Sequence, residues 1–215
     1  MARSPTPTRR DTDLRTAVLD ATRQLLVREG YRDLSMRDVA NMVGCSVSSI
    51  YLYFASKDEL VHTLMDEGFE RWHETMTAIA GRDAPPTARL EAACRAYVEF
   101  GLANPEFYEI MYMFHSDRMT RYPKELFRRA RRNMDLMGEM IRAVVPDAVQ
   151  SDADARIAAL ALWATLHGVV STLVSDRLDR RVDRTRYIEG SIQFALNGVR
   201  AFSPGALPKG EERDA

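Results

Sequence analysis

The amino-acid sequence predicts an all-α protein, on three observations. Apolar residues recur at the three- and four-residue spacing of helices through most of the 215-residue chain. Ser-x-x-Asp and Ser-x-x-Glu patterns, which favour helix starts, precede several of these segments, and glycine or proline follows them. No segment shows the sustained alternation of apolar and polar residues that is typical of a strand.

The N-terminal part of the chain predicts helices separated by short turns. The first covers residues 11–29, the second 36–43, the third begins after Ser46, and the fourth runs from 57 toward 80. The residues that start or stop these helices are Gly30, Ser35, Asp38, Gly44, Ser46, Ser56 and Glu59. Because a sharp angle between two helices favours glycine, Gly44 predicts a helix-turn-helix over residues 35–53.

The rest of the chain continues as helices. Their start signals are Pro86, Asn104 with Pro105, Pro123, and Ser151 with Asp154, and the last helix covers residues 184–202. Residues 157–173 are apolar on nearly every side, so this helix is expected to lie between its own core and a second surface. The polar tail, residues 203–215, is rich in Pro and Gly and is expected to be disordered.

The predicted third helix presents a short, hydroxyl-rich surface. With Ile50 and Phe54 facing inward, the residues left pointing outward are Val47, Ser48, Ser49, Tyr51, Leu52 and Tyr53. Such a helix suits the DNA major groove, where hydroxyls reach base edges or phosphates and apolar side chains meet thymine methyl groups. Lys57 adds a positive charge in the first turn of the next helix. The alternative is a helical hairpin with incidental tyrosines that serves only protein contacts.

The stretch LSMRDVANMVGCSVSSIYLYFASKDEL resembles the N-terminal domain of the TetR family of bacterial transcriptional regulators, and the resemblance covers residues 14–60. It implies a double-stranded DNA operator as the partner. The DNA contacts it implies are Ser35, Arg37, Ser46, Val47, Ser48, Ser49, Tyr51, Leu52, Tyr53 and Lys57. The family often has Lys or Arg at position 47, Gly at 48, Thr at 49 and His at 52. Fewer charges here imply fewer phosphate contacts and more reliance on Arg37 and the N-terminal arm.

The resemblance also implies how the chain is organised. Residues 1–10 are a flexible basic arm, 11–56 the three-helix DNA-binding domain, 57–202 the helical-bundle domain for ligand binding and dimerisation, and 203–215 the tail. In the arm, Arg9 and Arg10 are expected to reach the minor groove or flanking phosphates; a solvated tail is the alternative. Two recognition helices in a homodimer would read a palindromic operator.

Dimerisation is assigned to the last two helices. A stripe of small residues permits close approach of a partner copy, and the final helix offers a second apolar stripe. The residues concerned are Ala161, Ala164, Gly168, Ser171, Ile192, Ala195 and Val199.

The stretch LWATLHGVV resembles a TetR subgroup whose C-terminal domain carries a Trp-His-Gly signature. The chain contains 11 methionines, whose flexible side chains suit a pocket for apolar ligands, although methionine and aromatic residues are also ordinary core filler. The predicted pocket residues are Tyr97, Tyr108, Met111, Met134, Met137, Trp163 and His167. The effector is expected to be a small apolar molecule.

The composition argues against other classes of protein. The 30 basic and 31 acidic residues give no global basic field, and the four histidines lack metal-like pairing, so we expect no cofactor, no metal and no enzymatic turnover. Cys45 and Cys94 give no disulfide framework, and no apolar run approaches about 18 residues, so a cytoplasmic protein without a membrane partner is expected. Cys45 is either a redox switch or, more simply, a buried small hydrophobe.

The sequence therefore predicts a ligand-responsive DNA-binding transcriptional regulator, a repressor that a small apolar effector releases from its operator. Ligand binding would tilt the helix that begins near Lys57 and change the spacing of the two recognition helices. The alternative is a ligand-independent DNA-binding regulator, either an activator or a nucleoid-type protein.

Overall fold

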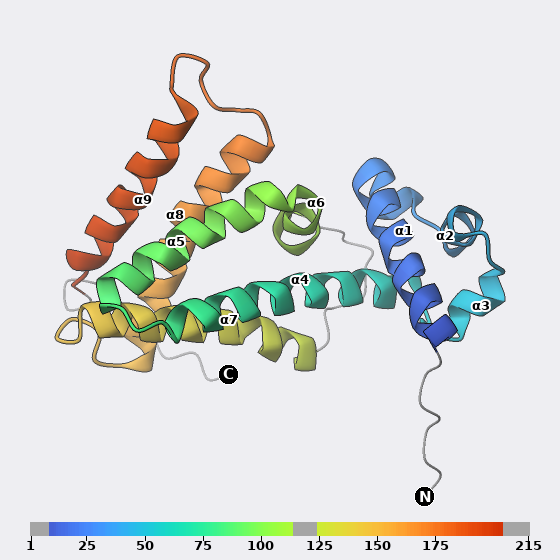
Figure 1. Ribbon diagram of the computed structural model, residues 1–215, viewed down its shortest axis with the longest axis horizontal. Helices are drawn as coiled ribbons and strands as arrows, with labels where there is room; N and C mark the ends of the chain where they lie inside the picture. Colours follow the sequence, from blue (N-terminus) through green and yellow to red (C-terminus); the bar gives the residue numbers. More distant parts are fainter. Residues whose placement is uncertain (1–8, 114–123, 204–215) are drawn as a thin grey trace, which may run out of the picture. The chain divides into compact units, whose positions relative to one another are not determined.

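The computed structural model describes residues 9–113 and 124–203, which form helices joined by turns and short loops (Figure 1). The elements are α1 (Arg9–Asp33), α2 (Met36–Val43), α3 (Val47–Tyr51), α4 (Lys57–Ala80), α5 (Pro86–Ala103), α6 (Pro105–Tyr108), the π-helical turn η1 (Glu109–Met113), α7 (Lys124–Val144), α8 (Asp152–Val174) and α9 (Arg184–Arg200). These two ranges contain no strand, and the predicted all-α class is confirmed.

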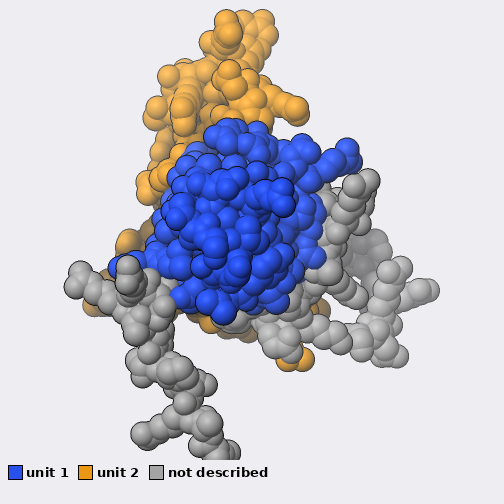
Figure 2. Space-filling view, turned by 90° about the vertical axis from the view of Figure 1, so that its right-hand side faces the viewer, with its two compact units in different colours: residues 1–69, 104–127 blue, residues 70–103, 128–215 orange. Residues whose placement is uncertain are grey.

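The chain divides into two compact units, coloured blue and orange in Figure 2. Unit 1 contains residues 1–69 and 104–127, and unit 2 contains residues 70–103 and 128–215. Helix α4 begins in unit 1 and ends in unit 2. Unit 1 therefore takes in the start of α4 as well as α6 and η1, which the sequence assigned to the regulatory domain.

Unit 1 is built around one apolar core. Helices α1, α2 and α3 and the start of α4 contribute buried aliphatic and aromatic side chains, and η1 adds Ile110, which is 1% exposed. From α1, the guanidinium of Arg23 lies 4.9 Å from the ring centroid of Phe107 and 3.4 Å from the carboxylate of Glu106, both on α6. These contacts tie α6, a segment distant in sequence, to α1.

Local capping sets most helix ends where the sequence predicts them. Gly30 interrupts α1 with φ 77° and ψ 170°, and the backbone N–H of Asp38 donates to the Ser35 hydroxyl at the start of α2. Ser151 and Asp154 form a complete capping box on α8. At the start of α4, the Glu59 carboxylate accepts from the N–H of Ala55 at 2.6 Å, one residue before the predicted cap Ser56.

The predicted N-terminal arm is too long. Helix α1 already begins at Arg9, so Arg9 and Arg10 are helical and do not belong to a flexible arm. The rest of that arm, residues 1–8, lies outside the described residues, as do His115, Pro123 and all of the predicted tail except Ser203.

Unit 2 packs the end of α4 with α5, α7, α8 and α9. Trp72 is 1% exposed and meets Tyr97 edge to face at 5.3 Å between ring centroids. A Cβ built on Gly138 of α7 would lie 3.2 Å from the Cβ of Ala155 on α8, so glycine permits this close approach. The arrangement places α8 and α9 side by side and antiparallel (Figure 1).

Helix α8 corrects one expectation. By length and composition alone it is apolar enough to cross a membrane, so the expectation that no apolar run approaches that length is wrong. A core helix of a soluble protein meets the same criterion, and α8 buries Leu162, Leu166 and Val170 in unit 2. Length and composition are therefore weak evidence that α8 spans a membrane.

Candidate nucleic-acid interface

The helix-turn-helix is held by caps on both sides of its turn. Gly44 adopts the left-handed conformation, with φ 76° and ψ 34°, and its N–H donates to the carbonyl of Ala40 at 2.9 Å. Ser46 then caps α3, its hydroxyl accepting from the N–H of Ser49 at 3.1 Å. Because left-handed backbone favours glycine, this sharp turn follows directly from the sequence.

The inner face of α3 anchors it to unit 1. Ile50 is fully buried and Phe54 is 2% exposed, and both belong to the core cluster that includes Val39 of α2. The inward direction of these side chains, predicted from the sequence, is confirmed. A helix of five residues has little stability of its own, so this burial fixes its position.

The outer face of α3 projects exposed side chains from this rigid support. Leu52 is 81% exposed and Tyr51 is 53% exposed, large values for apolar and aromatic residues, and Ser48 is exposed beside them. Nearby on α2, Met42 is 41% exposed and Arg37 is exposed. The surface thus combines one guanidinium, hydroxyls and apolar groups, and the α3 residues themselves carry no charge.

Two residues of the predicted outward set do not point fully outward. Val47 and Tyr53 are partly buried and pack against the core of unit 1, so the expectation that they face solvent is corrected. Ser46 and Ser49 are also engaged within the protein, since their hydroxyl oxygens lie 2.8 Å apart. The freely projecting part of the surface is therefore Ser48, Tyr51 and Leu52.

Lys57 lies in a setting that the sequence did not indicate. Its ammonium donates to the backbone carbonyls of Tyr31 at 3.0 Å and Leu34 at 3.1 Å, and lies 4.2 Å from the centroid of the Tyr31 ring. The Tyr31 hydroxyl donates to the carboxylate of Asp58. Burial, followed by the hydrogen bond to Asp58 and the charge of that carboxylate, raises the pKa of Tyr31 to about 12.

Sequence reasoning missed Arg15 on α1. Its guanidinium lies 5.3 Å from the centroid of the Phe54 ring and 3.7 Å from the carboxylate of Glu67. Arg15 packs against the side of unit 1 that carries the end of the helix-turn-helix. Arg15 and Phe54 are 39 positions apart in the sequence, so no local pattern predicts that the guanidinium packs on the ring.

The predicted ligand residues divide between the two units. Tyr108 and Met111 are buried in unit 1, and the others belong to unit 2. In unit 2, Tyr97 and Met137 are buried, while Met134 lines a shallow polar groove with Gly138 and Asp152. Trp163 and His167 stack on each other, and burial lowers the pKa of His167. The ligand pocket stays a prediction.

The predicted dimer residues fall into two groups. On α8, the small residues Ala161, Ala164 and Gly168 are exposed, and they lie beside Ile157 and Leu160, which are 44% and 51% exposed. On α9, the predicted stripe turns inward instead: Ile192, Ala195 and Val199 are at most 6% exposed and pack within their own chain. Their part in dimerisation stays a prediction, since Ala195 and Val199 also line a groove between α8 and α9.

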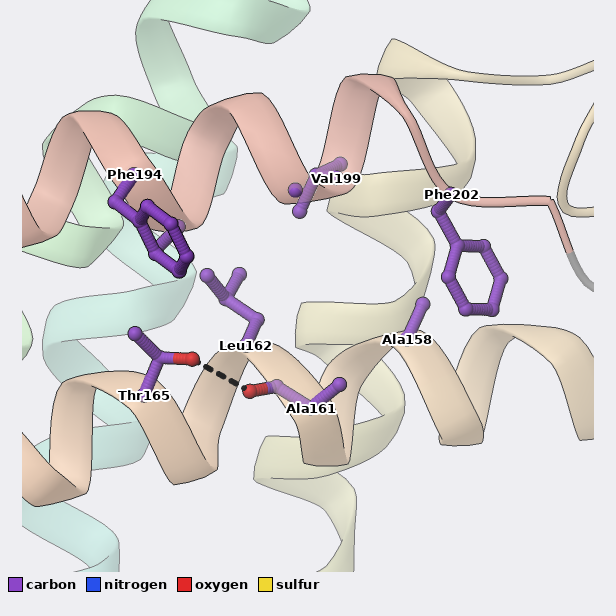
Figure 3. Close-up of a pocket in the computed structure, with 9 residues that line it drawn as sticks. Ala158, Ala161, Leu162, Thr165, Phe194, Val199 and Phe202 are labelled. Atoms are coloured by element: carbon purple, nitrogen blue, oxygen red, sulfur yellow. Dashed lines mark hydrogen bonds between the residues drawn. The ribbon is translucent and has the colours of Figure 1, made fainter.

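The exposed aromatic residue of α9 is Phe194, at 75%, which sequence reasoning missed. The sequence does hint at this exposure: Phe194 follows Ile192 by two residues, whereas the buried residues of the stripe recur at helical spacing of three or four. Phe194 lines a groove of about 140 Å³ between α8 and α9 with Phe202 at the other end (Figure 3). The apolar floor of this groove comes from Leu162, Ala195 and Val199.

The described residues hold no group of three or more His, Cys, Asp or Glu side chains that could bind a metal ion. In the same part of the chain both cysteines are free, and Cys94 is buried, which raises the pKa of its thiol to about 12. Cys45 is half-buried and packs against the core of unit 1.

Curated proteins similar to this chain are transcriptional regulators. It is 36% identical over 97 residues to an uncharacterized HTH-type transcriptional regulator in the dhlA 5′ region of Xanthobacter autotrophicus, a match of 43% of this chain and 47% of that protein. It is 25% identical over 190 residues to the HTH-type transcriptional activator FasR of Mycolicibacterium smegmatis, a match of 86% of this chain and 82% of that protein. The matches span only 35%, 47% and 38% of the first three curated relatives.

Solved structures share the fold. The fatty acid degradation regulator FadR from Bacillus halodurans aligns with a TM-score of 0.66 at 19% identity, over 92% of this chain and 99% of that chain. The narrower resemblance to the Trp-His-Gly subgroup stays a prediction.

Two family profiles match the sequence in separate places. The profile described as "Bacterial regulatory proteins, tetR family" covers residues 18–64, which contain α2, α3 and the caps of the turn. The profile described as "Tetracyclin repressor-like, C-terminal domain" covers residues 90–194, which contain most of the helical bundle. With the recognition-type helix and the helical bundle both matched, the chain belongs to the TetR family of bacterial regulatory proteins.

Proposed function

We propose that this protein is a DNA-binding transcriptional regulator that acts as a homodimer on a palindromic operator. The observation that carries the proposal is the outer face of α3, where Ser48, Tyr51 and Leu52 project from a helix whose other side is locked into a core. A rigid, exposed helix of this size fits the major groove, and hydroxyls and apolar groups contact phosphates, base edges and thymine methyl groups there.

The groove between α8 and α9 supports the dimer. Exposed apolar side chains on two adjacent antiparallel helices, Ile157 and Leu160 on α8 and Phe194 on α9, favour burial against a second copy. The small residues Ala161 and Ala164 permit close approach of that copy. A homodimer would carry two α3 helices, one for each half-site of a palindrome, whose half-sites lie about 34 Å apart.

A small, largely apolar effector is proposed to act on the helical bundle and release the protein from its operator. Met137, a buried methionine of the bundle in unit 2, is an adaptable side chain that suits such a ligand. One protein of the same fold is named a fatty acid degradation regulator, which makes fatty acyl compounds the first effectors to test. The effector would tilt α4 and thereby favour dimers that do not fit the operator.

The central test is binding of the purified full-length protein to the DNA that flanks its own gene. Wild-type protein should shift one specific fragment, with an affinity that falls steeply with salt. A Ser48→Ala, Tyr51→Ala double variant should lose the specific shift, whereas Arg180→Ala, an exposed change in the α8–α9 loop, should bind normally. Equal binding of the double variant and the wild type would exclude α3 as the reading surface.

The second candidate function is activation without a dissociating ligand. It is favoured by the similarity to a protein named a transcriptional activator, with 86% of this chain aligned. A reporter gene under the identified operator separates the two. Repression that fatty acyl compounds relieve supports the first function, and a rise in transcription that they do not alter supports the second. Nothing in either function needs a cofactor, and both place the protein with DNA in the cytoplasm.

A further inference from the structure

The first two residues of α4 hold the corner between α1 and α2. Lys57 donates from its ammonium to the carbonyl oxygens of Tyr31 and Leu34, at 3.0 and 3.1 Å, and its charge lies over the Tyr31 ring at 4.2 Å. Asp58 accepts the hydrogen bond of the Tyr31 hydroxyl. We name these three side chains, Tyr31, Lys57 and Asp58, the corner clamp.

The corner has carbonyl groups that need donors. Gly30 leaves helical geometry, with φ 77°, residues 31–33 form a short helical turn after this kink, and Ser35 then opens the next helix. Carbonyls at a helix end lack the N–H partners of a continuing helix and carry partial negative charge. An ammonium presents three N–H donors around one point, which matches two converging carbonyls and an aromatic face.

The clamp closes a loop of chain around the DNA-reading surface. Residues 36–56, which contain α2, the turn and α3, lie between the two segments that the clamp joins. Tyr31 itself is only 7% exposed, and its ring and hydroxyl are directed to Lys57 and Asp58. Because the clamp joins the end of α1 to the start of α4, it fixes the direction in which α2 leaves α1 relative to α4.

We propose that Lys57 is a positioning residue, which holds α2 and α3 at the angle that DNA binding requires, and that it is not a phosphate contact. The inference rests on the proposed DNA-binding function. It replaces the sequence-based expectation that Lys57 binds an anion at the N-terminus of α4. Arg37, which is exposed on α2, is the natural comparison, because it is free to meet phosphates.

The test is operator binding by the full-length Lys57→Met variant over a range of salt concentrations. Methionine keeps the length of the side chain and removes both the charge and the donors. We expect affinity to fall roughly tenfold at every salt concentration, because a hydrogen-bonded charge is lost, with the slope of log K against log salt unchanged. A phosphate contact predicts instead that the slope falls by about one.

Arg37→Met is the matched control and should reduce the slope. If Lys57→Met reduced the slope in the same way, or left the affinity unchanged, the positioning role would be overturned. If wild-type protein bound no DNA at all, the proposed function would fail, and this result is distinct from either outcome for Lys57.

A second measurement does not depend on the folding of a variant at position 57. The chain has three lysines, Lys57, Lys124 and Lys209, so a Lys124→Arg, Lys209→Arg protein gives a single side-chain ammonium signal in ¹⁵N NMR. In the free protein the Lys57 ammonium should exchange slowly with water, and its shift should hardly change when operator is added. Rapid exchange in the free protein, or a large shift on DNA binding, would contradict the clamp.

Discussion

Trp163 and His167 stack one helical turn apart on α8, with ring centroids 4.8 Å apart and ring planes at 27°. The imidazole is partly desolvated, and this burial lowers the pKa of His167 below its usual value of 6.5. Because the folded state favours the neutral ring, His167 leaves the stability of the fold undiminished above about pH 6.5 and lowers it as the pH falls from that value through the lower pKa of the folded state.

His167 should therefore make the folded protein sensitive to mild acid. We expect wild-type protein to lose more unfolding free energy between pH 7 and pH 5 than a His167→Phe variant, which keeps a stacked ring but does not titrate. Urea unfolding at both pH values measures the difference. NMR titration of the imidazole should give a pKa below that of a model peptide, and a value at or above it would contradict the prediction.

The left-handed backbone of Gly44 should make this position sensitive to a side chain of any size. A Cβ at Gly44 would meet nothing within 4 Å, so the cost of Gly44→Ala is one of backbone conformation alone. We expect a loss of about 1–2 kcal/mol in unfolding free energy. Gly44→Asn should cost clearly less, because asparagine tolerates this conformation. Equal losses for the two variants would show that backbone strain is not the cause.

The exposed apolar side chain of Leu52 should read a thymine methyl group. In the identified operator, replacing the contacted thymine by deoxyuridine removes only that methyl and should weaken wild-type binding about fourfold, the value of one buried methyl. Leu52→Ala should bind both operators equally. Met42→Ala, at another exposed apolar position of unit 1, should retain the preference. The idea fails if Leu52→Ala still distinguishes thymine from uracil.

Phe194 should decide the oligomeric state. Placing a charge at this position in Phe194→Arg would bury an unpaired cation in the proposed dimer, which is strongly unfavourable. Light scattering coupled to size exclusion should then report a monomer and a loss of operator binding. Gln193→Arg adds the same charge one residue earlier at a position that is also exposed, and should remain dimeric. A dimeric Phe194→Arg protein would place the interface elsewhere.

Local signals predicted much of the fold. The caps at Ser35, Ser46 and Ser151 and the left-handed Gly44 each depend on residues within about one helical turn, so the sequence alone indicates them. The inward direction of Ile50 and Phe54 follows from helical spacing in the same way. The family resemblance supplied the rest of the functional assignment.

Contacts between distant residues could not be predicted. Lys57 is 26 residues from Tyr31 and 23 from Leu34. Its sequence neighbours therefore give no sign that its ammonium donates to the carbonyls of those two residues. The same holds for Phe194, since spacing alone does not say which of two apolar faces of α9 packs inward. In both cases the tertiary arrangement, not the local pattern, decides whether the side chain is engaged within the protein or remains exposed to a partner.

The two-segment construction of unit 1 limits how the helix-turn-helix can be exchanged between relatives. A graft that ended at residue 56 would carry the reading surface but leave behind Leu60, Leu64 and Ile110, which are buried in the same core. It would also cut Arg23 from Phe107. A chimeric regulator made from this chain therefore needs three junctions, after residues 69, 103 and 127, so that α6 and η1 are transferred together with the helices they support.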